Sequence, residues 1–151
     1  MAERNRMRTK QYEEKALSYL LAGNERLFKA LRNQMRAASV SRRKRTANGI
    51  STYFKVPETI TPLKGQPLEF HIADVIAEEP SMDIRFDFTL YVKKGIIHNL
   101  QSYAYADTWP EGAEQFSFSY LKENPEGSGL LYRSDSRDWK YVTRMIDLSR
   151  V

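Results

Sequence analysis

The sequence predicts an α+β fold, in which an N-terminal helix or helix pair packs on one face of an antiparallel sheet of about six strands and a short helix ends the chain. Two observations lead to this prediction. Apolar residues recur at helical spacing in residues 10–37 and again near the C-terminus, whereas strict period-two alternation fills much of the chain between them. The alternating runs are joined by short connections, and helices followed by a run of strands are typical of α+β proteins.

The length and composition of the chain are consistent with one domain over residues 1–151. A chain of this length buries about 70% of the surface that its unfolded form exposes, and we expect residues 1–9 to be frayed. The absence of cysteine excludes a disulfide framework, a zinc ribbon and a thiol nucleophile. No stretch approaches the roughly 20 apolar residues of a transmembrane helix, and the basic N-terminus lacks the apolar region of a secretory signal. We therefore expect a cytoplasmic protein that does not bind membranes.

Residues 10–37 predict two helices separated at Gly23. One apolar stripe runs along the first helix through Ala16, Leu17, Leu20 and Leu21. Asn24 is expected to cap the second helix, because its side chain can accept hydrogen bonds from free N–H groups of the first turn. The second stripe consists of Leu27, Phe28, Leu31 and Met35. A single bent helix over residues 10–37 is the alternative.

The next segment predicts a β-hairpin around Asn48-Gly49, a dipeptide typical of a type I′ turn with positive φ at both residues. The strand after the turn alternates, and its inward-facing positions are Ile50, Thr52, Phe54 and Val56. The strand before it is too charged for the centre of a sheet. We expect that strand at an edge, where lysine and arginine also discourage edge-to-edge pairing.

Residues 83–110 predict a central hairpin. Its first strand has five apolar residues at alternate positions, namely Ile84, Phe86, Phe88, Leu90 and Val92. Lys93-Lys94-Gly95 forms the turn, in which Gly95 is free to adopt positive φ. Trp109-Pro110 ends the hairpin, because proline cannot donate to a ladder.

Further strands are predicted at residues 68–77, with Phe70, Ile72 and Ile76 facing inward, and at residues 115–121 and 130–132. The C-terminal segment from residue 135 onward predicts a terminal helix that Asp135 or Ser136 caps. Its apolar positions are Trp139, Val142, Met145 and Ile146.

Charge is divided unevenly along the chain. Residues 1–50 hold 13 Lys or Arg and 4 Asp or Glu, whereas residues 51–151 hold 11 and 15. Such asymmetry can indicate a nucleic-acid or acidic partner, or two solvated surfaces. The basic character is concentrated in Arg42, Arg43, Lys44 and Arg45, a run that resembles phosphate-binding sequences. In a strand, however, alternate side chains point to opposite faces, so the run would form one patch only on an exposed edge or in a loop.

Enzymatic motifs are absent from the sequence. His71 and His98 lack the HxH or HxxxH spacing of a metal site, and no metal or cofactor is expected. Four aspartates could supply an acid–base pair: Asp74, Asp83, Asp87 and Asp107. No GxSxG, P-loop or GxGxxG pattern accompanies them, so catalytic residues are not assigned and enzyme activity is not predicted. Arg85 and Asp87, two residues apart on one strand, predict a surface ion pair.

The end of the central hairpin is the candidate binding surface. Tyr105, Asp107 and Trp109 are the residues expected to contact a partner, because Tyr and Trp at an exposed sheet end are typical anchors of protein interfaces. The alternative is a structural turn in which Asp107 caps backbone N–H groups and Trp109 fills the edge of the core.

Residues 17–110 contain a leucine-rich helix signature, then a hairpin ending in Val-Pro, and then a strand pair ending near Trp-Pro. In this order of motifs they resemble a group of small bacterial proteins of unknown function. The matching positions are Leu20, Leu21, Gly23, Leu27, Leu31, Arg32, Gln34, Val56, Pro57, Trp109 and Pro110. Asn48-Gly49-Ile50 departs from the Gly-rich aromatic turn of that group, and Gln101 stands where an acid is common. The resemblance implies the architecture and no activity. Proteins of similar build also act as immunity proteins beside bacterial toxins, which is an analogy of fold.

The sequence therefore predicts a small protein-binding module, comparable to an immunity protein, whose partner is another protein. The first alternative is nucleic-acid binding by the basic N-terminal third, through Arg4, Arg6, Arg8 and Arg42 to Arg45. The second is an enzyme without a recognisable motif. Homo-oligomerisation is left open.

Overall fold

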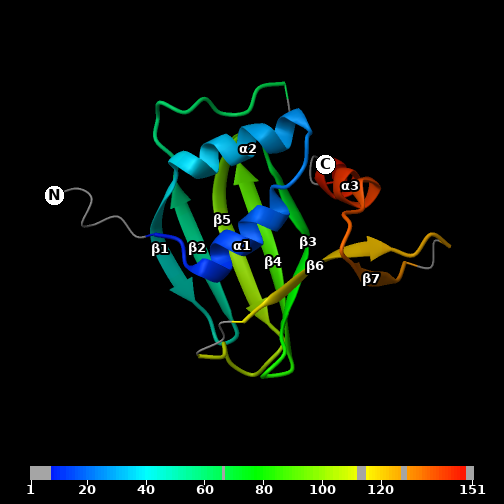
Figure 1. The fold of residues 1–151 in the computed structure, drawn as a ribbon. Helices are drawn as coiled ribbons and strands as arrows, with labels where there is room; N and C mark the ends of the chain where they lie inside the picture. The colour runs from blue at the N-terminus through cyan, green and yellow to red at the C-terminus, as the bar shows by residue number, and fades with distance from the viewer. Residues whose placement is uncertain (1–7, 66, 112–114, 127–128, 149–151) are drawn as a thin grey trace.

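The computed structural model describes residues 8–65, 67–111, 115–126 and 129–148. These residues form three helices and one seven-stranded antiparallel sheet (Figure 1). The helices are α1 (Gln11–Leu20), α2 (Arg26–Ala37) and α3 (Trp139–Leu148). The strands are β1 (Ser39–Arg45), β2 (Gly49–Lys55), β3 (Phe70–Glu79), β4 (Ile84–Lys93), β5 (Ile96–Ala104), β6 (Ser117–Glu123) and β7 (Leu131–Ser134). The predicted α+β class is thus confirmed.

The strand order is β1-β2-β5-β4-β3-β6-β7, and all neighbouring strands are antiparallel. The predicted hairpin of β4 and β5 lies in the middle of the sheet, and the charged strand β1 lies at its edge, as expected. The sheet has seven strands where about six were predicted, and the short strand expected at residues 130–132 is β7, which pairs with β6. The β6–β7 hairpin extends away from the rest of the sheet (Figure 1).

The helices α1 and α2 cover one face of the sheet, which we call the inner face (Figure 1). The predicted stripe of α1 is buried against it, and the alternating apolar residues of β4 from Phe86 to Val92 are buried on the same side. The largest side chains of this core that are fully buried are Phe86, Phe88, Leu20, Leu31, Ile72, Leu90, Ile97 and Leu100. Burial of such side chains stabilises the fold by about 1.5–3 kcal/mol each. The opposite face is called the outer face.

Two helices, and not one bent helix, precede the sheet. Gly23, with φ of +139°, lies between them. The predicted cap at Asn24 is wrong, because Glu25 occupies the N-cap position of α2 and its side chain makes no capping hydrogen bond. Arg32 of α2 instead donates to the carbonyl oxygens of Leu21 and Gly23 at 2.6 and 2.8 Å. It thereby satisfies groups that the end of α1 leaves without helical partners.

Of the two predicted turns, the one at Lys93-Lys94-Gly95 has the expected positive φ at its glycine, and the one at Asn48-Gly49 does not. Neither Asn48 nor Gly49 has positive φ, so the predicted type I′ turn is wrong there, although β1 and β2 do pair as a hairpin. Gly49 already belongs to β2, where an added Cβ would lie 3.0 Å from the Ser102 carbonyl oxygen. The close approach of the Ser102 backbone therefore explains why glycine occupies position 49. Lys94 and Gly95 both have positive φ, 54° and 76°, and join β4 to β5.

A bulge in β3 changes which residues face inward. The pairing of β3 with β4 shifts between Ile72 and Val75, so the inward positions move from Phe70 and Ile72 to Val75 and Ala77. Ile76 was predicted to face inward, but it pairs opposite Asp87 and lies on the outer side. It is nevertheless fully buried.

Helix α3 packs against β3. The predicted cap at Asp135 or Ser136 is wrong, because Asp138 directly precedes the helix and its Oδ1 accepts from the Tyr141 N–H at 3.2 Å. An N-cap residue must place its side-chain oxygen at the N–H groups of the first turn, which Asp138 does.

Candidate binding surface on the outer face of the sheet

The outer face of β2, β5 and β4 carries polar and tyrosine side chains that α1 and α2 leave uncovered. These positions alternate with the buried positions of the same strands, as the pleat requires. They are Ser51, Tyr53, Arg85, Asp87, Thr89, Tyr91, Gln101 and Tyr103. Tyr105 directly follows β5 and continues this alternation. A surface that combines aromatic rings with hydrogen-bonding groups is suited to contact with another macromolecule.

Four of these residues form one interacting group, which we call the Tyr105 cluster: Arg85, Asp87, Tyr103 and Tyr105. The Tyr105 hydroxyl donates to Asp87 Oδ2 at 2.7 Å, and Arg85 Nε donates to Asp87 Oδ1 at 3.1 Å. The Arg85 guanidinium lies 5.2 Å from the centre of the Tyr105 ring, and the rings of Tyr103 and Tyr105 meet edge to face at 5.1 Å. The predicted ion pair of Arg85 with Asp87 is confirmed.

The Tyr105 cluster is exposed and yet oriented. The side chains of Tyr103 and Tyr105 are 38% and 55% exposed. The hydrogen bond to Asp87, then partial burial, raises the pKa of Tyr105, so its hydroxyl remains a proton donor throughout the neutral range. Because each ring is held by a neighbour, less rotational freedom would be lost when a partner binds.

The three residues of the predicted binding surface, Tyr105, Asp107 and Trp109, are not all on the surface of the protein. Trp109 is only 8% exposed and packs against Tyr12 and Phe86, with ring centres 5.7 and 5.4 Å apart. Its backbone N–H donates to the carbonyl oxygen of Ala47 at 2.8 Å. Trp109 is therefore a core residue and does not form a surface anchor with Tyr105. Asp107 is exposed, and its side chain makes no hydrogen bond within the described part of the chain.

The four basic residues of β1 do not form one patch. Arg43 points to the inner face and forms an ion pair with the buried Glu13. Arg45 pairs with Glu111. Arg42 lies over the Tyr53 ring on the outer face, with its guanidinium 4.3 Å from the ring centre, and Lys44 is exposed. Successive side chains of the strand thus point to opposite faces of the sheet, so the basic run is divided between the two faces, as the pleat predicts. Arg4 and Arg6 lie outside the described residues.

A second, smaller group lies beside β1 on the outer face. The rings of Tyr53 and His98 meet edge to face at 5.5 Å, and Arg42 stacks on Tyr53. Partial burial, followed by the positive charges of Lys93 and Arg42, lowers the pKa of His98. The neutral imidazole is therefore favoured over the charged form, and its ring is available for aromatic contact.

On the inner face, a buried charged network joins α1 to the edge hairpin. The Glu13 carboxylate accepts from Arg43 Nη2 at 2.6 Å, from the Lys10 N–H at 2.7 Å and from the Thr52 hydroxyl. Burial raises the pKa of Glu13, but the hydrogen bonds from Arg43, Lys10 and Thr52 outweigh it, and the pKa lies below its ordinary value. This network was not predicted from the sequence.

A second buried ion pair attaches α3 to the body of the protein. Arg137 donates from Nε and Nη2 to the two carboxylate oxygens of Asp74, both at 2.9 Å. It also donates to the carbonyl oxygens of Leu20 and Ala22 at 2.9 and 2.8 Å. The contacts of Arg137, like those of Glu13 with Arg43 and Thr52, join segments that are far apart in sequence, so both networks hold the fold together.

The structure shows no arrangement typical of metal binding among the described residues, because no three His, Asp or Glu side chains gather there. The same residues include no helix that is long and apolar enough to span a membrane. Of the residues on the outer face, Tyr103 was missed as a binding candidate. Its position two residues before Tyr105 on an alternating strand was the signal that could have identified it.

Comparison with protein-family models, with curated proteins and with solved structures gives no match to this chain.

Proposed function

We propose that this protein is a small protein-binding module that contacts an acidic partner through the outer face of β2, β5 and β4. The observation that carries the proposal is the Tyr105 cluster, two exposed tyrosines held by each other, by Asp87 and by Arg85. Tyrosine and arginine are among the residues that contribute most binding energy in protein interfaces. Rings that are already oriented lose less entropy on association.

Charge on this face supports an acidic partner. Strand alternation places Arg42, Lys55 and Lys93 on the same side as the Tyr105 cluster, where Arg85 and Asp87 neutralise one another. Complementary charge raises the association rate and depends on ionic strength. A role like that of an immunity protein, in which the partner is an acidic toxin, is the specific form of this proposal.

The test is affinity capture from lysate of the native host with nuclease present. Wild type is compared with Y103S/Y105S and with Y132S, a control that removes a tyrosine of similar exposure (43%) on β7. We expect one stoichiometric protein that wild type and Y132S retain and that Y103S/Y105S loses. Capture of the same partner in equal amounts by all three proteins would contradict the proposal. Capture of a basic partner whose binding does not change with salt concentration would also contradict it.

A second candidate function is single-stranded nucleic-acid binding, and the observation that favours it is Arg42 stacked on Tyr53 beside His98. Base stacking on an aromatic ring contributes about 1–3 kcal/mol per base. Binding of a fluorescent oligothymidine should then weaken on adding salt, with a logarithmic slope that R42Q reduces by about 0.7. K29Q, which removes an exposed charge from α2, should leave the slope unchanged. Lack of binding at low salt would exclude this candidate.

A further inference from the structure

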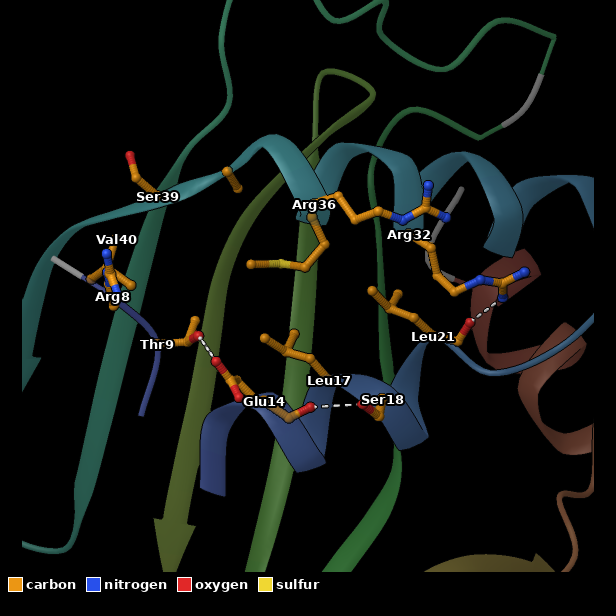
Figure 2. A pocket seen from close by; sticks show the side chains of 12 residues that line it. Arg8, Thr9, Glu14, Leu17, Ser18, Leu21, Arg32, Arg36, Ser39 and Val40 are labelled. Carbon is orange, nitrogen blue, oxygen red and sulfur yellow. Dashed lines mark hydrogen bonds between the residues drawn. The ribbon is translucent and has the colours of Figure 1, made fainter. Parts of the chain in front are cut away.

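A cavity of about 660 Å³ lies between α1, α2 and the start of β1 (Figure 2). Pockets for small molecules commonly have volumes of about 300–1,000 Å³. The cavity is on the inner side of the sheet, so it is separate from the Tyr105 cluster. Its floor is apolar and consists of Leu17, Leu21, Met35 and Val40.

The rim of the cavity is basic. Arg32 and Arg36 stand four residues apart on α2, which places them as neighbours on one helix face (Figure 2). Arg8 is a third arginine of the lining. The one acidic residue of the lining is Glu14, whose carboxylate accepts from the Thr9 hydroxyl at 3.0 Å. With three arginines and one glutamate, the lining carries an excess of two positive charges.

The two arginines of α2 have different surroundings. Arg32 is held by its hydrogen bonds to the carbonyl oxygens of Leu21 and Gly23. The Arg36 side chain makes no hydrogen bond or ion pair with any other residue that the structure describes. Like charges four residues apart on a helix repel one another. An anion between them would relieve that repulsion and supply the acceptors that a guanidinium can bind in a bidentate manner.

We propose that this cavity binds a small amphipathic anion, an unbranched acyl or alkyl chain that ends in a carboxylate or phosphate group. The anionic group accepts hydrogen bonds from Arg36 and from the remaining N–H groups of Arg32. The chain lies along Leu17, Leu21 and Met35, where water is replaced by apolar side chains. Arginine at the rim and leucine and methionine at the floor suit a fatty acid and an alkyl phosphate alike, because the two share this chemistry.

The test is isothermal titration of the full-length protein with dodecanoate, and separately with dodecyl phosphate, below the concentration at which either forms micelles. We expect saturable binding at one site. Among shorter carboxylates, affinity should increase about fourfold with each methylene that the cavity buries, and acetate should not bind. Dodecanol, which has the same chain without charge, should bind at least about tenfold more weakly than dodecanoate.

Two variants locate the anionic group. R36Q should weaken dodecanoate binding about tenfold or more, whereas K29Q removes one charge from an exposed position of the same helix and should have no effect. Thermal unfolding of both variants checks that the fold is retained. The proposal is overturned if R36Q and K29Q bind equally well, if dodecanoate does not bind, or if binding is seen only with anionic lipid vesicles. None of these outcomes affects the proposed function of the outer face.

Discussion

Gly23 shows how one residue connects two ends of the chain. Its φ of +139° lies in a region that side chains other than glycine rarely adopt. A Cβ at this position would also overlap the ring of Trp139 at the start of α3. The ring in turn packs edge to face on Phe28, with ring centres 5.4 Å apart. The helix break was predictable from the glycine, but the contact that requires it comes from a residue near the other end of the chain.

We expect G23A to lower the free energy of unfolding by more than G65A does. Gly65 also has positive φ, but nothing lies within 4 Å of the position that a Cβ would occupy there, so only backbone strain of about 1–2 kcal/mol applies. The additional loss in G23A, about 1–3 kcal/mol, comes from displacement of the Trp139 ring and from a φ of +139°, which alanine adopts less readily than the +66° of Gly65. Urea denaturation of both variants measures the difference. Equal losses would show that Trp139 moves aside without consequence.

Glu13 is a buried acid whose charge the fold requires. Its folded-state pKa is lowered, so its stabilising contribution is present above the pKa of the unfolded chain, about 4.3, and is lost as pH falls through the folded pKa. E13Q should therefore lower the free energy of unfolding by about 3 kcal/mol at pH 7, because Arg43 loses its partner.

The difference in stability between wild type and E13Q should shrink as pH falls below about 4, since a protonated Glu13 resembles glutamine. Denaturation curves from pH 3 to 7 measure it. E14Q is the matched control on the exposed side of α1 and should change stability by less than about 1 kcal/mol at every pH. A difference between wild type and E13Q that does not vary with pH would contradict this account.

At the scale of elements, α3 depends on Arg137 for its attachment. This side chain is 4% exposed, and its guanidinium bonds to Asp74 and to the end of α1. It also lies 4.9–5.2 Å from the ring centres of Phe28, Tyr120 and Trp139. A helix of ten residues has little stability of its own, so these tertiary contacts hold it on the sheet.

R137M should destabilise the protein by about 3–5 kcal/mol, because it leaves the carboxylate of Asp74 buried without its partner. R133M removes the exposed pair of Arg133 with Glu78 and should cost less than about 1 kcal/mol. Thermal unfolding followed by circular dichroism compares the two variants. Hydrogen exchange in α3 should rise in R137M before global unfolding. Similar stability of both variants would contradict the assigned role of Arg137.

At the scale of the whole molecule, the sheet separates two surfaces. The Tyr105 cluster lies on the outer face, and the cavity between α1 and α2 lies on the inner side. Substitutions at sites that are distant and share no partners usually have additive effects. Y103S/Y105S should therefore leave dodecanoate affinity unchanged, and R36Q should leave capture of the protein partner unchanged. A change of more than about twofold in dodecanoate affinity in Y103S/Y105S, or in the amount of partner that R36Q captures, would show that the two surfaces are coupled.

The faces of the central strands were predictable because alternation is a local property. Phe86, Phe88 and Leu90 had to point the same way once β4 formed, and burial of that side left Arg85 and Asp87 outside. The same rule separated Arg43 from Arg42. It failed at Ile76, where a bulge in β3 shifts the alternation by one residue. No local signal in the sequence marks that bulge.

Local patterns in the chain were enough to predict the class of the fold, the helix break, the edge position of β1, the central hairpin and the outward position of Tyr105. These features follow from hydrophobic period, charge and turn residues, which act over a few neighbouring positions. Long-range packing was needed to bury Trp109, to bring Glu13 to Arg43 and Arg137 to Asp74, and to place Arg32 and Arg36 beside a cavity. Those contacts join residues distant in sequence, and the close packing of the helices on the sheet determines which of them meet.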